Sequence, residues 1–263
     1  GFLGMAPDMT ATFDETTLSD VEGFWDGPRP VREGVFAQLR ERDELLFSKE
    51  RAIEVDGEVI LPAGPGFWSL VLHEDVVAAS KQPELFCSGK GSNIGDLPPE
   101  MLEFYGSMIN MDDPRHARLR RIVSRGFTPR VLAQLNESIV TKAKGVVDGV
   151  AHKGTVDFVT EVSARLPLAL ICDLMGIPES EYDLVFDLTN IILSSGDPEF
   201  IEEGANPLEA LLSAGATLAE LMNTIGAERR EHPTDDLTSA LLHAEVDGET
   251  LTNDELASFF ILL

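Results

Sequence analysis

The chain has 263 residues, with 20 Lys and Arg against 46 Asp and Glu, which gives a formal net charge of −26. Nonspecific nucleic-acid binding needs a cationic surface, so this charge argues against a nucleic-acid partner. A hydrophobic content of 43% allows a sizeable core and excludes a disordered chain. Two cysteines, Cys87 and Cys172, are too few for a disulfide framework and fit a reducing cytoplasm.

The first twenty residues do not show a basic region followed by an apolar one, as a signal peptide would. No uninterrupted apolar run approaches the ~18 residues that a transmembrane helix needs. We therefore predict a cytoplasmic protein without a membrane anchor.

The first predicted element is a helix over residues 30–46. Its apolar positions include Val35, Leu39 and the pair Leu45 and Leu46, spaced as on one helix face.

A small β region is predicted near residues 53–72. Two short strand-like runs flank Asp56 and Gly57, the dipeptide that favours a tight hairpin turn. A further strand leads into a helix beginning near Glu74, and a loop rich in Gly, Ser and Pro follows over 88–99.

From Pro114 onward nearly every segment predicts helix, with stops supplied by Gly and Pro. Residues 252–255 match a capping box, because Thr252 can accept from the Glu255 amide while Glu255 reaches back. The last helix ends on two leucines without a C-terminal signal, so we expect the sequence to stop within a helix. The expected helices cover 114–126, 129–152, 160–175, 179–194, 207–230, 235–245 and 253–263.

Positive charge is gathered on one of these helices. Residues 115–130 contain six arginines and no acid: Arg115, Arg118, Arg120, Arg121, Arg125 and Arg130. At 100° per residue, His116 and Arg120 fall on the apolar face of the helix, one turn apart, whereas Arg118, Arg121 and Arg125 fall on the solvent face.

An arginine on an apolar face needs an anionic partner, and a neighbouring histidine can add a second donor. His116 and Arg120 are therefore a candidate site for a buried carboxylate or phosphate. Two simpler interpretations stay open. Arg120 can pair with a structural acid, and the three solvent-face arginines can form an ordinary solvated surface instead of a docking patch for an acidic partner.

Four segments in order resemble the bacterial cytochrome P450 enzymes, the haem-thiolate monooxygenases. Residues 109–130 resemble the C helix, whose pattern is Asp-Pro-x-His-x-x-x-Arg followed by Phe-Thr-Pro. The other three correspond to the strand-helix unit before the substrate loop, the E helix with its turn, and the H helix leading into the central I helix. They are residues 67–88, 162–181 and 235–263. The resemblance implies a mainly α fold with a small β region, with residues 1–263 forming a single partial domain that corresponds to the N-terminal ~60% of the P450 fold.

The resemblance also implies roles for the arginine helix. Residues matching His116 and Arg120 hold the haem propionates in the family. The face with Arg118, Arg121 and Arg125 corresponds to the surface where an acidic ferredoxin, reduced by its reductase, docks to deliver electrons.

The family's iron ligand, a cysteine thiolate in a Gly-rich loop, has no counterpart in the 263 residues. Cys172 lies in an apolar helix, as a structural thiol does, and Cys87 is not in the ligand context. The Glu-x-x-Arg pair and the dioxygen-handling Gly and Thr of the family are also absent. We therefore expect haem b to take its iron ligand beyond Leu263, and we assign no catalytic residue and no metal ligand to this chain.

Three apolar segments match the parts of the family that line the substrate pocket. Their candidates for contact with a hydrophobic substrate, of steroid, terpenoid or fatty-acid type, are Met108, Ile109, Ile192, Phe259, Phe260 and Leu263. Ordinary core packing is the simpler interpretation of each.

The sequence thus predicts a haem-dependent monooxygenase that uses dioxygen and ferredoxin-derived electrons. Two rival functions remain: a truncated, non-catalytic relative that acts as a binding module, and a helical anion-binding regulator that never held haem.

Overall fold

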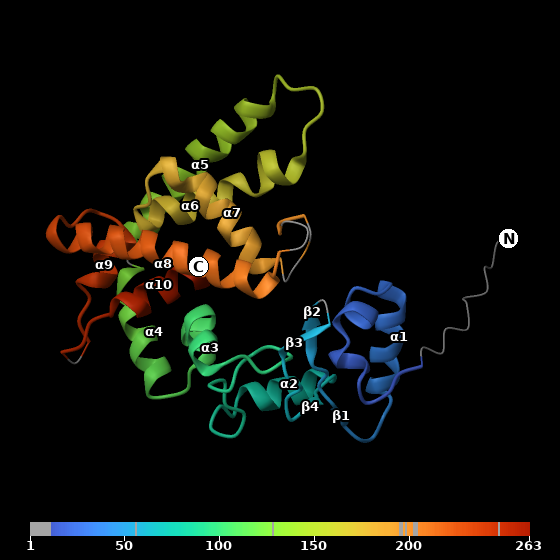
Figure 1. Cartoon of the computed structure of the whole chain (residues 1–263). Helices are drawn as coiled ribbons and strands as arrows, with labels where there is room; N and C mark the ends of the chain where they lie inside the picture. The colour runs from blue at the N-terminus through green and yellow to red at the C-terminus, as the bar shows by residue number, and fades with distance from the viewer. Residues whose placement is uncertain are drawn as a thin grey trace. The chain divides into compact units, whose positions relative to one another are not determined.

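A computed structural model describes residues 12–55, 57–127, 129–194, 197, 199–201, 205–246 and 248–263. Figure 1 shows the chain, which divides into two compact units, Gly1–Pro98 and Pro99–Leu263. Each is described by itself.

In the first unit, two short helical turns, Thr17–Ser19 and Val21–Trp25, precede α1 (Arg29–Arg40). Val35 and Leu39 are buried with Leu18 and Phe24, as the helical spacing predicted for the first two. The helix ends at Arg40, so the prediction that it continues to residue 46 was wrong. The chain turns there and Leu46 starts a strand instead.

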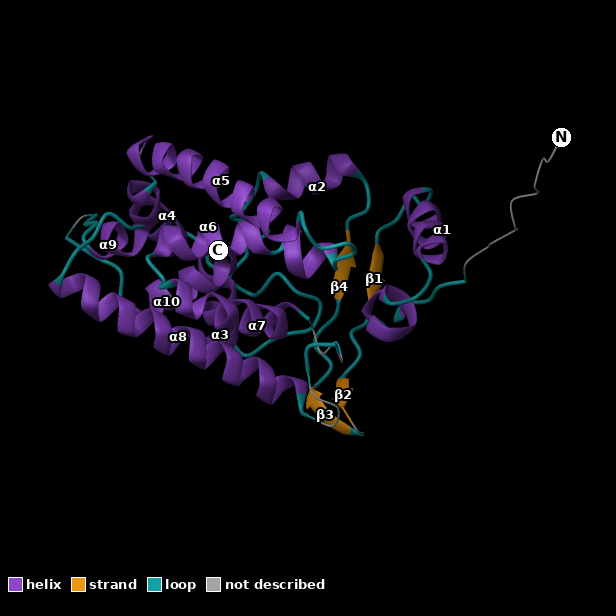
Figure 2. Cartoon of the chain, turned by 90° about the horizontal axis from the view of Figure 1, so that it is seen from above, coloured by secondary structure: helices purple, strands orange, loops and turns teal. Residues whose placement is uncertain are grey.

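The strands form two separate antiparallel pairs (Figure 2). β2 (Ile53–Val55) and β3 (Glu58–Leu61) make the expected hairpin, with Gly57 at φ +81°, a backbone conformation that favours glycine. β1 (Leu46–Ser48) pairs with β4 (Phe67–Ser69), a long-range pairing that the sequence did not predict. α2 (His73–Ser80) follows, one residue before the expected start.

In the described residues of the second unit, helices are joined by turns and loops, with one bridge between Val246 and Glu249 in the turn that precedes the last helix. The helices are α3 (Pro99–Gly106), α4 (Arg115–Gly126), α5 (Pro129–Val150), α6 (Arg165–Met175), α7 (Tyr182–Leu193), α8 (Pro207–Glu231), α9 (Leu237–Leu242) and α10 (Asn253–Leu262). Single helical turns at Ser107–Asn110, Val159–Ser163 and Glu179–Glu181 stand between them. α3 begins at Pro99, the last residue of the segment predicted as a loop, and α6 is preceded by a separate π turn.

The core of this unit lies where α4, α6, α8, α9 and α10 meet. α8 packs along both α7 and α10 (Figure 1). Several of the fully buried side chains come from different helices of this group: Ile122, Cys172, Met175, Met222, Leu241 and Leu256. Burial raises the pKa of the Cys172 thiol to about 12, which fits the structural role expected of it.

The predicted capping box starts α10. Thr252 Oγ1 accepts from the Glu255 amide at 3.1 Å, and the Thr252 amide donates to Glu255 Oε2 at 2.9 Å. The start of this helix is therefore fixed by two reciprocal hydrogen bonds.

Candidate functional site

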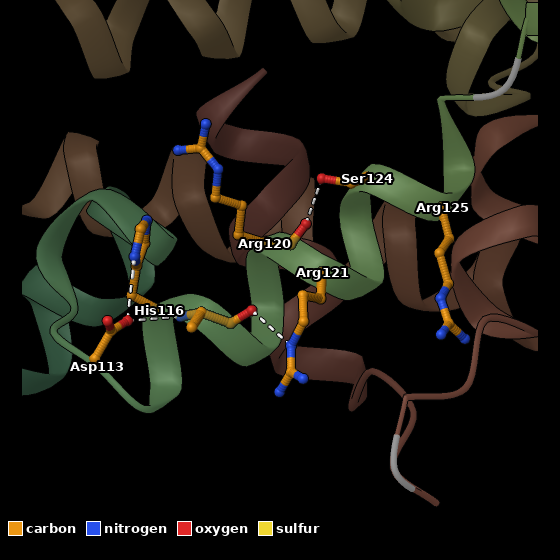
Figure 3. A pocket seen from close by; sticks show the side chains of 7 residues that line it. Asp113, His116, Arg120, Arg121, Ser124 and Arg125 are labelled. Carbon is orange, nitrogen blue, oxygen red and sulfur yellow. Dashed lines mark hydrogen bonds and ion pairs between the residues drawn. The ribbon is translucent and has the colours of Figure 1, made fainter.

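α4 presents its basic side chains on more than one side. His116 and Arg120 extend from the same side of the helix, and Arg121 and Arg125 extend toward the opposite one (Figure 3). One turn of helix separates His116 from Arg120, so the two side chains can reach one ligand together.

An open hollow of about 490 Å³ follows this part of α4. Its wall is basic and hydrophilic, consisting of Asp113, His116, Ala117, Arg120, Arg121, Ser124 and Arg125. The Arg120 side chain is exposed here, and among the residues that the structure describes no carboxylate or carbonyl accepts from its guanidinium. The interpretation that Arg120 pairs with a structural acid thus finds no support in the described part of the chain.

His116 is half-buried beside Arg120. Its Nδ1 lies 3.5 Å from Asp113 Oδ1. The same carboxylate oxygen accepts a hydrogen bond from the Ala117 amide at 3.1 Å. Asp113 therefore lies beside the imidazole and accepts from an amide at the start of α4.

Arg118 does not lie on the solvent face, and this part of the helical-wheel prediction was wrong. Its side chain is 23% exposed and forms ion pairs with Glu249 and Glu255, the second at 2.7 Å. Its second terminal nitrogen donates to the Thr250 carbonyl at 3.0 Å. A wheel drawn for one helix does not contain these acceptors, which come from the turn and helix some 130 residues later.

Arg121 and Arg125 are exposed, as the wheel predicted for the solvent face. Arg121 donates to the Ala117 carbonyl at 3.3 Å, and Arg125 donates to the Glu245 carbonyl. The side chain of Arg130 lies outside the described residues.

The six predicted substrate-pocket residues are not gathered around one described hollow. Phe259 and Phe260 are 5% exposed and belong to the core, and Met108 and Ile192 pack against that core. Ile109 and Leu263 are exposed. The pocket assignment stays a prediction.

Two further hollows adjoin α3. One, of about 430 Å³, lies between α3, α4 and α10, and the other, of about 370 Å³, lies between α3 and α8 with an apolar wall. None of the six predicted pocket residues lines either hollow.

A second arginine site of this unit is closed. Arg229 Nε lies 2.5 Å from Asp236 Oδ2, and Arg229 also donates to the Gly176 carbonyl at 3.1 Å. The side chains of Arg229 and Asp236 are only 13% and 8% exposed. This pair ties the end of α8 to the start of α9 and the end of α6.

The described residues contain no cluster of three or more metal-ligating His, Cys, Asp or Glu side chains. None of their helices combines the length and the apolar character needed to cross a membrane.

Comparison with known proteins identifies what this helix arrangement resembles. The chain is 40% identical over 256 residues to a methyl-branched lipid omega-hydroxylase of Mycobacterium tuberculosis, covering 95% of this chain and 58% of that protein. It is 32% identical to a steroid C26-monooxygenase of Mycolicibacterium smegmatis, covering 89% of this chain and 53% of that one. A cytochrome P450 of Mycobacterium marinum, solved in complex with pseudoionone, superposes with a TM-score of 0.82 at 36% identity, covering 96% of this chain and 61% of that structure.

The chain belongs to the cytochrome P450 family. No family model matches it. This P450 chain spans somewhat more than half the length of the relatives it matches. The predicted resemblance to bacterial cytochrome P450 enzymes and the predicted mainly α fold are confirmed. The roles of the individual site residues stay predictions.

Sequence reasoning missed one group of residues around α4. Glu249 and Glu255 are the partners of Arg118, yet Glu255 was interpreted only as a capping residue. The acid-rich segment 245–255 contains five acidic residues and no basic one, and this charge asymmetry was the available signal.

Proposed function

We propose that this P450 chain serves a haem-dependent monooxygenase that hydroxylates a hydrophobic small molecule with dioxygen. The observation that supports this most directly is Arg120: an arginine in a basic hollow, without an acceptor among the described residues, on the helix that matches the family's haem-contacting segment. A cation in that setting suits a carboxylate ligand.

The residues present fit haem b. Arg120 would bind a propionate with its planar guanidinium, and His116 would donate a second hydrogen bond from the preceding turn. Asp113 would hold the imidazole of His116 in place from the far side of the ring. Haem, when bound, supplies the iron that activates dioxygen, while the chain's own residues bind and orient the group.

The proposed substrate class is apolar. The relatives named above are a lipid hydroxylase, a steroid monooxygenase and a P450 crystallised with pseudoionone, and a steroid, terpenoid or fatty-acid-like molecule fits this series. We keep Phe259 and Phe260 of α10 as the first candidates for its wall, because α10 matches the family's pocket-lining helix. Both rings belong to the same buried cluster as the core side chains of α4.

For electron delivery we propose an acidic ferredoxin and its reductase as partners, with docking on the α4 side that carries Arg121 and Arg125. Both side chains are exposed and project away from Arg120 (Figure 3). We leave Arg118 out of this docking face because its charge is paired with two carboxylates of the same chain. A cytoplasmic location also stays a prediction.

The alternative function is a non-catalytic binding module. Spectroscopy on the protein purified from its native host separates the two. A monooxygenase should show a Soret band and, after reduction and addition of carbon monoxide, the red-shifted band of a thiolate-ligated haem. A protein that carries no haem at all would contradict the proposal and favour the binding module.

A further inference from the structure

All three guanidinium nitrogens of Arg118 contact one segment of the chain, residues 249–255. Nε contacts Glu249, one terminal nitrogen contacts Glu255 Oε1 at 2.7 Å, and the other donates to the Thr250 carbonyl at 3.0 Å. The three acceptors lie within seven residues of sequence, at the turn that leads into α10. A planar group with several donors suits such a set better than a point charge does.

Glu255 is shared between two structures. Its Oε2 accepts from the Thr252 amide in the capping box, and its Oε1 accepts from Arg118. The Glu255 side chain is 15% exposed, and its contact with Arg118 is partly buried. The first turn of α10 is thereby fixed to itself and to α4 by one carboxylate.

The two sides of α4 thus have different partners. Arg118 and Arg120 are two residues apart, which on an α-helix separates their directions by about 160°. Arg120 faces the basic hollow, and Arg118 contacts the start of α10. α4 therefore carries, two residues apart, a ligand of the proposed propionate site and the side chain that contacts the start of α10.

We propose that Arg118 is a positioning residue: it holds the first turn of α10 against α4, and so fixes the Phe259 and Phe260 wall relative to the proposed haem site. The substrate-wall part of this statement rests on the proposed function. The placement of α10 by Arg118 rests only on the contacts above.

Removal of Arg118 takes away the cation that pairs directly with two of the acids near the start of α10. Glu249 and Glu255 would lose their shared cation, and Asp254 lies in the same first turn of α10. The half-buried Glu255 carboxylate then favours solvent over its place in the capping box. The expected consequence is local opening of the first turns of α10, without opening of the remaining helices.

Amide hydrogen exchange in the natural protein tests the placement directly and needs no haem. In Arg118→Gln and in Glu255→Gln, exchange of residues 253–260 should accelerate by at least about tenfold, the effect expected when charge-assisted hydrogen bonds are lost. Exchange in α6 and α9 should stay at the parent rate. Arg118→Lys should recover part of the protection, because lysine keeps the charge but lacks the fork.

Arg165→Gln is the matched control. Arg165 also pairs with a carboxylate, Asp183, at 2.8 Å and donates to a backbone carbonyl, but it lies on α6 away from α4 and α10. Its loss should leave exchange of 253–260 unchanged. If Arg118→Gln and Glu255→Gln leave α10 protected, or accelerate exchange equally in every helix of the unit, the positioning role is refuted.

A second measurement, on the haem-loaded protein, tests the wall. Imidazole and 4-phenylimidazole both bind haem iron, but only the second fills the apolar space beyond it. Arg118→Gln should weaken 4-phenylimidazole binding several-fold and leave imidazole binding and haem content unchanged. Equal affinities in parent and variant would refute the link from Arg118 to the wall.

The two measurements separate this inference from the proposed function. A protein without haem contradicts the proposed function, while the exchange experiment still decides whether Arg118 positions α10. If the Arg118→Gln variant loses haem as readily as the Arg120→Ala variant, Arg118 acts on the haem site itself. That result would refute the separate roles of Arg118 in positioning α10 and of Arg120 in binding haem.

Discussion

Two arginines of the helical unit illustrate opposite uses of the same side chain. Arg229 is 13% exposed and satisfied by Asp236 and the Gly176 carbonyl, so all its partners come from the chain. Arg120 is exposed, lines a hollow and has no acceptor among the described residues. The comparison teaches that an arginine with a complete set of internal partners stabilises the fold, whereas one with donors left over is the better candidate for binding a ligand.

The largest expected effect is at the closed site. Asp236→Ala removes the buried partner of Arg229 and leaves a mostly buried cation whose remaining carboxylate, Glu228, is 63% exposed. This should lower the free energy of unfolding by about 3–5 kcal/mol. Asp236 Oδ1 also accepts from the Ser239 amide at 2.7 Å, so the cap of α9 is lost as well. Chemical denaturation of the purified protein measures this.

Asp183→Ala provides the control. Asp183 pairs with Arg165, but its side chain is 81% exposed, so the loss should lie near the 0–1 kcal/mol of surface pairs. Equal losses in the two variants would remove the contrast between closed and exposed arginine pairs.

The closed site should also depend on pH. Burial by itself raises the pKa of Asp236, but hydrogen bonds from Thr234, Arg229 and Ser239 outweigh it and the pKa is lowered overall. A carboxyl with a lowered pKa in the folded state stabilises it above the unfolded pKa, near 3.8, and loses this contribution as the pH falls through the folded value. The difference in unfolding free energy between the parent and Asp236→Asn should therefore be constant near neutral pH and shrink only below about pH 4. A difference that grows on acidification would contradict this sign.

At the open site, Arg120→Ala should leave the stability of the haem-free protein almost unchanged and weaken haem retention. A charge-assisted hydrogen bond to a carboxylate contributes about 1.5–3 kcal/mol, so retention should fall by one to two orders of magnitude. Transfer of haem to an acceptor protein measures the rate of loss. Arg115→Ala is the control on the same helix, because Arg115 pairs with Glu103 and lies off the hollow.

The sequence predicts a contact well when the two residues are close in the chain, and poorly when they are far apart. The hairpin around Gly57, the capping box at Thr252 and the divergence of Arg120 from Arg121 follow from neighbours within a few residues, and the sequence predicted each of them. The β1–β4 pairing and the Glu249 and Glu255 partners of Arg118 depend on residues about 20 and about 130 positions away, which local patterns do not contain. The helix predicted over 30–46 forms only as far as Arg40, and its end was wrong for the same reason, since Leu46 pairs with a partner strand.

The docking face should give a smaller and salt-dependent effect. Arg121→Glu combined with Arg125→Glu should slow ferredoxin-driven turnover at low salt through the association rate, and the deficit should shrink as salt rises. Peroxide-driven turnover, which needs no partner, should stay near the parent value. If both kinds of turnover fall together, the two arginines are structural and the docking proposal fails.

The smallest expected effect is at His116. Its imidazole can give the proposed propionate one hydrogen bond, whereas the guanidinium of Arg120 presents several donors and a permanent charge. Nδ1 of the ring also lies 3.5 Å from Asp113 Oδ1, so a carboxylate of the chain already neighbours one of its two nitrogens. His116→Ala should therefore increase haem loss only a few-fold, about the effect of one ordinary hydrogen bond.

In Asp113→Ala the imidazole loses its neighbouring carboxylate. Haem loss should increase by a similar factor, because the hydrogen bond from His116 to the propionate is misdirected. The double variant His116→Ala with Asp113→Ala should then lose haem no faster than His116→Ala alone. Additive losses would show that Asp113 acts on haem retention independently of His116, through the amide that it accepts at the start of α4.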